Sequence, residues 1–388
     1  MFKQYHLKNY RFRLIVYVTA LSILGVAVVG SARESLQTKQ VIGLLLGLFV
    51  MAVTSCIDYS FILKFSWLIY LFTIGLLGLI RFFGDKAGGA TRWIQLGSFR
   101  FQPSELAKIL IILFFAYFFS KQQEQLNTFK IILISGILIF IPWFMILQQP
   151  DLSTSIVVAL VFISLLFLAG LSYKIIVGAF AVSIPAIIIF ITFVLQPDQK
   201  ILNDYQYRRI MSFLQPENPA YAEDIYQQQN SIMAIGSGQM WGKGLNNNTV
   251  FSVKNGNFIP EPQTDFIFSV AGEELGFVGA AIILLLLLCI AIECIMIGRK
   301  AKDLAGKLIC GGIASLISFQ AFINICVVTG LMPNTGLPLP FVSNGLTSMV
   351  SLFIGIGLVL NVGLQPKKYG NGVWDDNRKN NYSIVSPS

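Results

Sequence analysis

The sequence predicts an all-α protein that spans a membrane many times, and its composition supports that prediction in two ways. Of its 388 residues, 55% are hydrophobic and only 12% are charged, whereas a soluble domain carries roughly 25% charged residues. The hydrophobic residues, which include 32 phenylalanines, gather in runs long enough to cross a bilayer as helices. A soluble core cannot bury that much apolar surface, so the solvent of these helices must be lipid.

About ten transmembrane helices are expected, one from each apolar run. A second run follows the first at once, and no clear small-residue cleavage site separates them, so the first run is expected to be a span and not a cleavable signal. The even number places both termini on the same side of the membrane. The runs lie near residues 14–31, 40–57, 66–82, 105–119, 130–148, 153–170, 175–195, 275–297, 308–330 and 347–364.

The distribution of lysine and arginine predicts the orientation. With the N-terminus inside, the inner segments hold 16 of the 28 cations and five acids, and the outer segments hold 12 cations and 13 acids. Cytoplasmic loops carry the excess of positive charge, so both termini are expected to be cytoplasmic. The net charge of +9 is therefore interpreted as membrane orientation, and no nucleic-acid partner is expected.

Residues 1–364 are expected to form a single transmembrane domain. Two of its outer segments are long, one at about 82–104 and a large extracellular loop at about 196–274 between spans seven and eight. Segments of that length without structure are uncommon unless they serve a function. Residues 365–388 are polar and rich in Asn and Ser, which predicts a disordered cytoplasmic tail.

The available side chains restrict the chemistry. The single histidine, His6, lies in the N-terminal stretch, far from any outer site. The five cysteines sit in or beside apolar runs without the spacing of a metal site, which is typical of packing. A site at the outer face must therefore use carboxylates, cations, hydroxyls and backbone groups.

Polar residues cluster at the outer ends of the apolar runs, where ionisable groups are costly unless they are paired, hydrated or used. Glu105 and Lys108 are three residues apart at the entrance to a span, so they form either an intrahelical ion pair or part of a site. Arg92 lies either at lipid headgroups or against a phosphate. Asp151, on a short outer turn, is expected mainly to cap the next helix. Arg208 and Arg209 suit either a pyrophosphate or a loop ion pair.

The acids that border the eighth span give the strongest signal. Asp265 lies between a polar loop and an apolar helix, where it would act as an N-cap unless Thr264 does so. A cap does not explain why Glu273 and Glu274 enter the same apolar segment. Three acids beside one helix indicate a water-accessible acidic cleft.

A glycine-rich stretch around Lys243, from Gly236 to Gly244, lacks the spacing of a phosphate-binding P-loop and follows no strand. It is interpreted as a structured turn.

In this order, these segments resemble the SEDS family (shape, elongation, division and sporulation), close to its RodA type, with FtsW and SpoVE as relatives. The resemblance covers nearly the whole chain outside the tail, and it departs from the family at Asn344, where an aromatic residue is usual. The motifs that carry it are Thr91-Arg92-Trp93, Phe101 to Lys108, Gln149 to Thr154, Gln228 to Ser231, Ile235 to Gly238, Gly242 to Leu245, Thr264 to Phe268 and Pro338 to Ser343.

The resemblance implies a peptidoglycan glycosyltransferase that polymerises lipid II on the outer leaflet during cell-wall elongation, in complex with a class B penicillin-binding protein. It implies that Asp265 is the catalytic residue and that Glu105 and Lys108 are functionally important. The candidates for binding substrate or pyrophosphate are then Glu105, Lys108, Arg92, Arg208, Arg209, Asp151, Lys243, Glu274 and Ser343.

Two mechanisms follow as hypotheses. In one, Asp265 is the general base that deprotonates the acceptor hydroxyl, with its pKa raised in a partly dry site near Glu273 or Glu274. In the other, Asp265 holds a divalent cation, Mg or Mn, that carries the pyrophosphate charge. Two other functions also fit ten helices with polar residues: a lipid II flippase, and a scaffold without catalytic activity. Polar residues concentrated on the outer face, with little midplane charge, argue against the flippase.

Overall fold

The computed structural model describes residues 10–87, 90–96, 99–149, 151–194, 196, 204–246, 252, 259 and 261–365. The tail predicted to be disordered lies almost entirely outside these residues. The structure places a long helix on each of the ten apolar runs, which confirms the predicted fold class. These helices are α1 (Phe12–Ala32), α2 (Glu34–Cys56), α4 (Ser66–Phe83), α5 (Pro103–Lys121), α6 (Phe129–Gln148), α7 (Leu152–Ala169), α8 (Tyr173–Val194), α11 (Ile267–Arg299), α12 (Leu304–Val328) and α13 (Leu346–Leu364).

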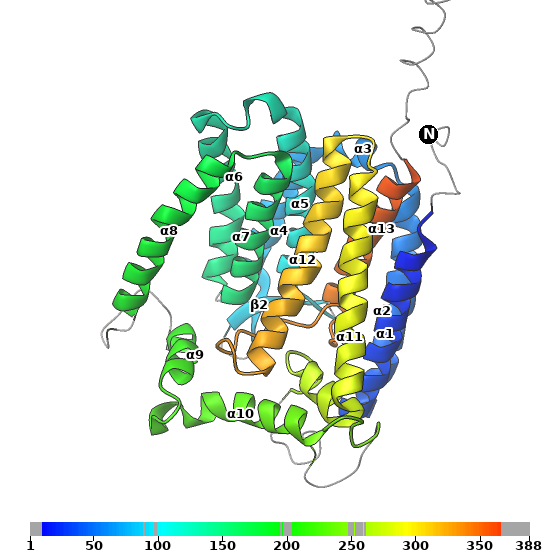
Figure 1. Ribbon diagram of the computed structural model, residues 1–388, viewed down its shortest axis with the longest axis vertical. Coiled ribbons are helices and arrows are strands. Elements are labelled where there is room, and N and C mark those ends of the chain that lie inside the picture. The colour runs from blue at the N-terminus through cyan, green and yellow to red at the C-terminus, as the bar shows by residue number, and fades with distance from the viewer. Residues whose placement is uncertain are drawn as a thin grey trace, which may run out of the picture.

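Within the described part of the chain, nine of these helices, all except α8, are long and apolar enough to cross a membrane by length and composition. The short helix α3 (Tyr59–Leu63) follows α2, and a 3-10 turn, η3 (Gln123–Gln125), follows α5. Most of the long helices form one bundle, whereas α8 stands at its edge (Figure 1).

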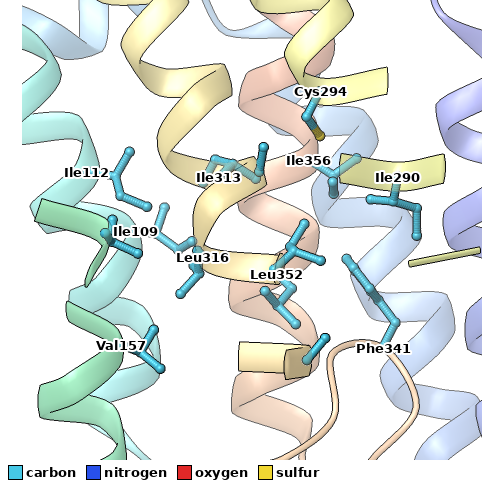
Figure 2. Packing of buried hydrophobic residues seen from close by; sticks show 14 of the residues in the cluster. Ile109, Ile112, Val157, Ile290, Cys294, Ile313, Leu316, Phe341, Leu352 and Ile356 are labelled. Carbon is cyan, nitrogen blue, oxygen red and sulfur yellow. The ribbon is translucent and has the colours of Figure 1, made fainter. Parts of the chain in front are cut away.

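The core of the bundle lies around α12 and α13, which pack against α2, α5, α7 and α11. Buried side chains of α5, α7, α11, α12 and α13 meet there, together with the ring of Phe341 from the loop before α13 (Figure 2). The close packing of α2 on α13 depends on Gly47, where a Cβ atom would collide with the ring of Phe353. The central residues are Ile109, Ile112, Val157, Ile290, Cys294, Ile313, Leu316, Phe341, Leu352 and Ile356.

The described residues of the first long segment that was predicted to be outer form a small antiparallel sheet. It consists of β1 (Gly84–Ala87), β2 (Ala90–Leu96) and β3 (Phe99–Phe101), in the order β1-β2-β3. The sequence predicted a long outer segment here, unlikely to be structureless without a function, but it did not indicate the strands. Strand β2 pairs with β1 on one side and with β3 on the other, both antiparallel. Asp85 lies opposite Trp93, and Gln95 lies opposite Arg100.

The second long outer segment contains two helices, α9 (Asp204–Leu214) and α10 (Ala222–Ser237), joined by the 3-10 turn η4 (Pro219–Tyr221). Helix α10 runs across the end of the bundle where α1 ends (Figure 1), which is the predicted outer end. Helix α9 lies beside it and brings Arg208 and Arg209 to this end of the molecule.

Helix α11 begins eight residues before the predicted span and is interrupted at Gly276, whose φ of 66° and ψ of −165° are not helical. The turn at residues 239–244 satisfies the backbone groups that the interruption exposes. The amides of Lys243 and Gly244 donate to the carbonyls of Glu273 and Glu274 at 3.0 and 2.9 Å, and that of Phe277 donates to the carbonyl of Gln239 at 2.8 Å. The glycine-rich stretch is therefore a structured turn, as predicted.

Candidate active site

Two guanidinium groups converge on Asp265 at the predicted outer end of the bundle. The connector between α12 and α13 passes beside these side chains at Gly336. Distances from the position that a Cβ atom of this glycine would take show how close the three side chains lie. A Cβ atom on Gly336 would lie 3.1 Å from Oδ2 of Asp265, 3.4 Å from Nη1 of Arg209 and 3.9 Å from Nη1 of Arg92. One carboxylate and two guanidinium groups, predicted as separate clusters, thus form a single site.

The backbone around Asp265 is held in place on both sides. Asn324 of α12 donates from Nδ2 to the carbonyl of Asp265 at 2.7 Å, and Ser343 donates from Oγ to the carbonyl of Thr264 at 2.7 Å. The N-cap residue of α11 is Phe266, which makes no side-chain cap. The cap suggested for Asp265 or Thr264 is therefore not made, because the helix begins one residue later.

The pKa of Asp265 is raised to about 6. Burial is the largest cause, and the nearby Arg209 and Arg92 oppose it by favouring the charged form. The acids that raise the pKa further are Glu261 and Asp151, not Glu273 or Glu274 as the sequence suggested. A carboxylate with a pKa near neutrality can act as a general base in the physiological range.

Asp151 has the expected capping role and a second one. Its Oδ1 accepts from the amide of Thr154 at 3.1 Å, which caps α7. The same oxygen lies 3.7 Å from Nη1 of Arg92, and Oδ2 accepts from Nε2 of Gln102 at 3.4 Å. Asp151 therefore joins the start of α7 to the strand β2 that carries Arg92.

Glu105 and Lys108 form the ion pair that their spacing predicted, with Nζ of Lys108 2.8 Å from Oε1 of Glu105. Both residues are almost fully buried, at 2% and 3% exposure, so the pair is not a surface contact. Lys108 also donates to Oε1 of Gln320 at 2.9 Å, and Nε2 of Gln320 donates to the carbonyl of Pro338 at 2.9 Å. The pair is thereby linked to the connector that passes Asp265.

The structure distinguishes the two neighbouring arginines of α9. Arg209 is partly buried and lies at Asp265, whereas Arg208 is exposed. Ser343 helps to shape the site through its side-chain hydroxyl, because its Oγ also accepts from the amide of Leu339 at 2.7 Å. It therefore bonds both the connector and the segment before α11.

Lys243 and Glu274 lie in a second polar cluster, at the interruption of α11. Nζ of Lys243 donates to Oε1 of Glu273 at 2.7 Å. Oγ of Ser31, at the end of α1, donates to Oε1 of Glu274 at 2.6 Å and accepts from the amide of Asn246 at 2.9 Å. These contacts hold α1, α11 and the glycine-rich turn together.

The site fits a divalent cation poorly. Asp265 is surrounded by two guanidinium groups, which already supply positive charge, and carboxylate ligands for Mg or Mn would have to compete with them. Within the described ranges, no three His, Cys, Asp or Glu side chains come together as a metal site.

Sequence analysis missed Gln320 and Asn324, which contact the Glu105–Lys108 pair and the Asp265 backbone. The sequence contains a signal that could have identified them, because two side-chain amides four residues apart lie on one face of an otherwise apolar helix. Amides in a membrane helix need hydrogen-bond partners, and here those partners are site residues.

Comparisons with known proteins show which family the chain resembles. The family model of the FtsW, RodA and SpoVE cell cycle proteins matches residues 4–368. The peptidoglycan glycosyltransferase MrdB of Escherichia coli K12 is 34% identical over 363 residues, covering 93% of this chain and 95% of that protein. A probable peptidoglycan glycosyltransferase FtsW of Geobacter sulfurreducens is 33% identical over 381 residues, with 93% and 97% covered.

Two solved structures have the same fold. A chain from a peptidoglycan synthase complex that coordinates polymerization and crosslinking superposes with a TM-score of 0.74 at 27% identity, covering 91% of this chain and 97% of that one. The rod shape determining protein RodA of Thermus thermophilus superposes with a TM-score of 0.65 at 26% identity, with 91% and 96% covered.

Proposed function

The chain belongs to the FtsW, RodA and SpoVE family of cell cycle proteins, and on that premise we propose that it is a peptidoglycan glycosyltransferase. Its substrate is lipid II, which it polymerises into glycan strands during cell-wall elongation. The names of its relatives support the reaction. Elongation as the setting is supported by the likeness to MrdB and to a rod shape determining protein.

The protein is a multi-pass membrane protein, and we propose that both termini are cytoplasmic. The inner segments then carry the excess of lysine and arginine, and the site around Asp265 faces the outer leaflet. A class B penicillin-binding protein is the proposed partner, supported by the likeness to a chain from a complex that couples polymerization to crosslinking. Lipid molecules surround the exposed apolar faces of the helices.

The observation that carries the proposed mechanism is the meeting of Asp265, Arg92 and Arg209 beside Gly336. Polymerisation joins a sugar hydroxyl of one substrate to the anomeric carbon of another and breaks that carbon's bond to lipid pyrophosphate. Asp265 takes the proton from the attacking hydroxyl, and its pKa of about 6 leaves it ionised at neutral pH. Arg92 and Arg209 stabilise the negative charge on the departing pyrophosphate.

A divalent cation, Mg or Mn, held by Asp265 is the alternative means of neutralising that charge. It is less well supported, because the two arginines occupy the surroundings of the carboxylate. No step of the mechanism is assigned to a metal.

Replacing Asp265 with Asn tests the assignment, because the amide keeps the size of the carboxylate and cannot accept the proton. The protein, purified with its penicillin-binding protein, is given lipid II in detergent, and glycan chains are measured. The Asp265→Asn variant is expected to lose polymerisation by at least about a hundredfold while it remains folded. Full activity would remove Asp265 from the mechanism.

The same assay and a growth test separate the other functions. A flippase would form no glycan chains from lipid II in detergent, even with the unchanged protein. A scaffold without catalytic activity would support cell growth equally well with Asp265→Asn. Neither function explains why a carboxylate with a raised pKa is held between two arginines at the outer end of the bundle.

A further inference from the structure

Two buried amides of α12 lie between the Glu105–Lys108 pair and the segment that carries Asp265. Gln320 and Asn324 are one helical turn apart, and their exposures are 0% and 1%. Nδ2 of Asn324 donates to two carbonyls, those of Asp265 at 2.7 Å and Leu337 at 2.6 Å. Nε2 of Gln320 donates to the carbonyl of Pro338, the next residue of the connector, at 2.9 Å.

We propose that Gln320 and Asn324 are positioning residues for the glycosyl transfer. They fix Asp265 and the connector at residues 336–338 relative to each other, so that the carboxylate meets the attacking hydroxyl in the productive geometry. The proposal rests on the proposed function and adds to it two residues that do not touch the substrate. Asn324 has the more direct role, because its Nδ2 donates both to the Asp265 segment and to the connector.

The connector needs such support because it has no regular structure of its own. The residues between α12 and α13 that pass Asp265 form neither helix nor strand, so their carbonyls are not satisfied by a ladder. A buried carbonyl without a partner is costly, and α12 supplies the donors for two successive ones. The α12 helix packs against α5, α7, α11 and α13 in the bundle (Figure 1), so it can serve as a common support for both sides of the site.

The contact to Lys108 extends this support to α5. Oε1 of Gln320 accepts from Nζ of Lys108 at 2.9 Å, while Lys108 also bonds Glu105 at 2.8 Å. A shift of the buried ion pair would therefore move Gln320 and, through it, Pro338. This gives the Glu105–Lys108 pair a way to affect the transfer without touching the substrate.

Matched substitutions separate these contacts. Asn324→Leu and Asn324→Asp both keep the approximate size and remove the amide donor, and only the second adds a charge, so agreement between them excludes a charge effect. Asn324→Gln keeps the amide as the conservative rescue variant. Gln320→Glu keeps an acceptor for Lys108 and loses the donor to Pro338, whereas Gln320→Met loses both.

Each variant is purified as the full chain with its penicillin-binding protein, and kcat and KM for lipid II are measured per folded molecule. For Asn324→Leu and Asn324→Asp, we expect kcat to fall by about ten- to a hundredfold with KM changed less than about twofold, because a displacement of about 1 Å can cost that much. Asn324→Gln should recover part of the loss. Both Gln320 variants should lower kcat.

Asn361 provides a matched control for a purely structural amide. It is also fully buried, and it bonds the amide of Tyr59 and the carbonyl of Ser55 at 3.0 and 2.8 Å, at the opposite end of the bundle. Asn361→Leu should lower the melting temperature and leave kcat per folded molecule unchanged. If Asn324→Leu and Asn324→Asp behave like Asn361→Leu, the positioning role is wrong.

This result is distinct from a failure of the proposed function. If the unchanged protein forms no glycan chains, or if Asp265→Asn keeps full activity, the glycosyl transfer or its base is wrong. If those two measurements come out as expected and only the Asn324 variants retain kcat, the positioning role alone is overturned.

Discussion

Two opposing effects set the protonation of Asp265. An aspartate beside two arginines would ordinarily have a low pKa. Here burial outweighs Arg209 and Arg92, with a smaller contribution from Glu261 and Asp151, and the pKa rises to about 6. The arginines thus allow a partly buried carboxylate to remain ionised at neutral pH, while the loss of solvation keeps it basic enough to take a proton.

The pH dependence of kcat should report this balance. Asp265 must be ionised to act as a base, so activity should rise from pH 5 to 7 through a midpoint near 6 and fall about tenfold per pH unit below it. Arg209 lowers the pKa, so Arg209→Gln should move the midpoint to higher pH. Arg208→Gln, at the exposed neighbour, should not displace it. A midpoint near 4 that neither substitution moves would contradict the assignment of Asp265.

Asp151 combines a cap and a charge, and two substitutions separate them. Both substitutions remove the ion pair with Arg92, but Asn is also a good N-cap residue, so Asp151→Asn should have a free energy of unfolding about 1 kcal/mol higher than Asp151→Ala. Both remove an acid that raises the pKa of Asp265, so both should move the pH midpoint downward. Melting curves and pH profiles measured on the same samples check the two effects. Equal stability of the two variants would show that the cap contributes nothing.

At the scale of elements, the interruption of α11 links the helix to the outer loop. Gly276 and Gly242 both have positive φ, and each approaches the other's backbone so closely that neither has room for a Cβ atom. The turn thereby satisfies the donors and acceptors that the broken helix leaves open. The loop and the helix should lose stability together when this contact is disturbed.

Substituting Gly276 tests that coupling. Gly276→Ala places a Cβ against the backbone of Met240 and Trp241 and strains a positive φ, so it should cost about 2 kcal/mol or more. The measurement is the melting temperature in detergent. Gly75→Ala is the matched control, because nothing lies within 4 Å of that position in α4 and alanine is favoured in a helix interior. Equal melting temperatures for the two variants would show that the contact is unimportant.

The sequence predicted the elements whose signal is local. Ten apolar runs gave ten helices because lipid requires each span to satisfy its own hydrogen bonds. The start of α11 was missed because Glu273 and Glu274 look like loop residues until Lys243 and Ser31 bond them. The strands at residues 84–101 were missed because they have only four, seven and three residues, and such short segments give too little alternation to distinguish a strand from a loop.

At the scale of the whole molecule, the site exists only because distant segments meet. Arg92 comes from β2, Arg209 from α9 and Asp265 from the segment just before α11, and the connector before α13 passes beside them. The sequence identified all three as candidates, because ionisable residues near apolar runs are unusual. It could not show that Arg209 and not Arg208 faces the carboxylate, or that α12 holds it, since both depend on how the helices pack.

The orientation of the bundle is the remaining test at this scale, because a lipid-linked substrate on the outer leaflet requires the site to face outward. Trp241, in the turn at the proposed outer end, is 80% exposed, and Cys56, where α2 ends on the opposite side, is also exposed.

In spheroplasts, a membrane-impermeant maleimide should label the Trp241→Cys variant at once. The unchanged protein should react at Cys56 only after the membrane is permeabilised. The contrast follows from the 16 cations of the proposed inner segments, which resist translocation. Labelling of Cys56 in sealed spheroplasts, with Trp241→Cys protected, would reverse the orientation and place Asp265 on the cytoplasmic side, where the proposed reaction could not use an outer-leaflet substrate.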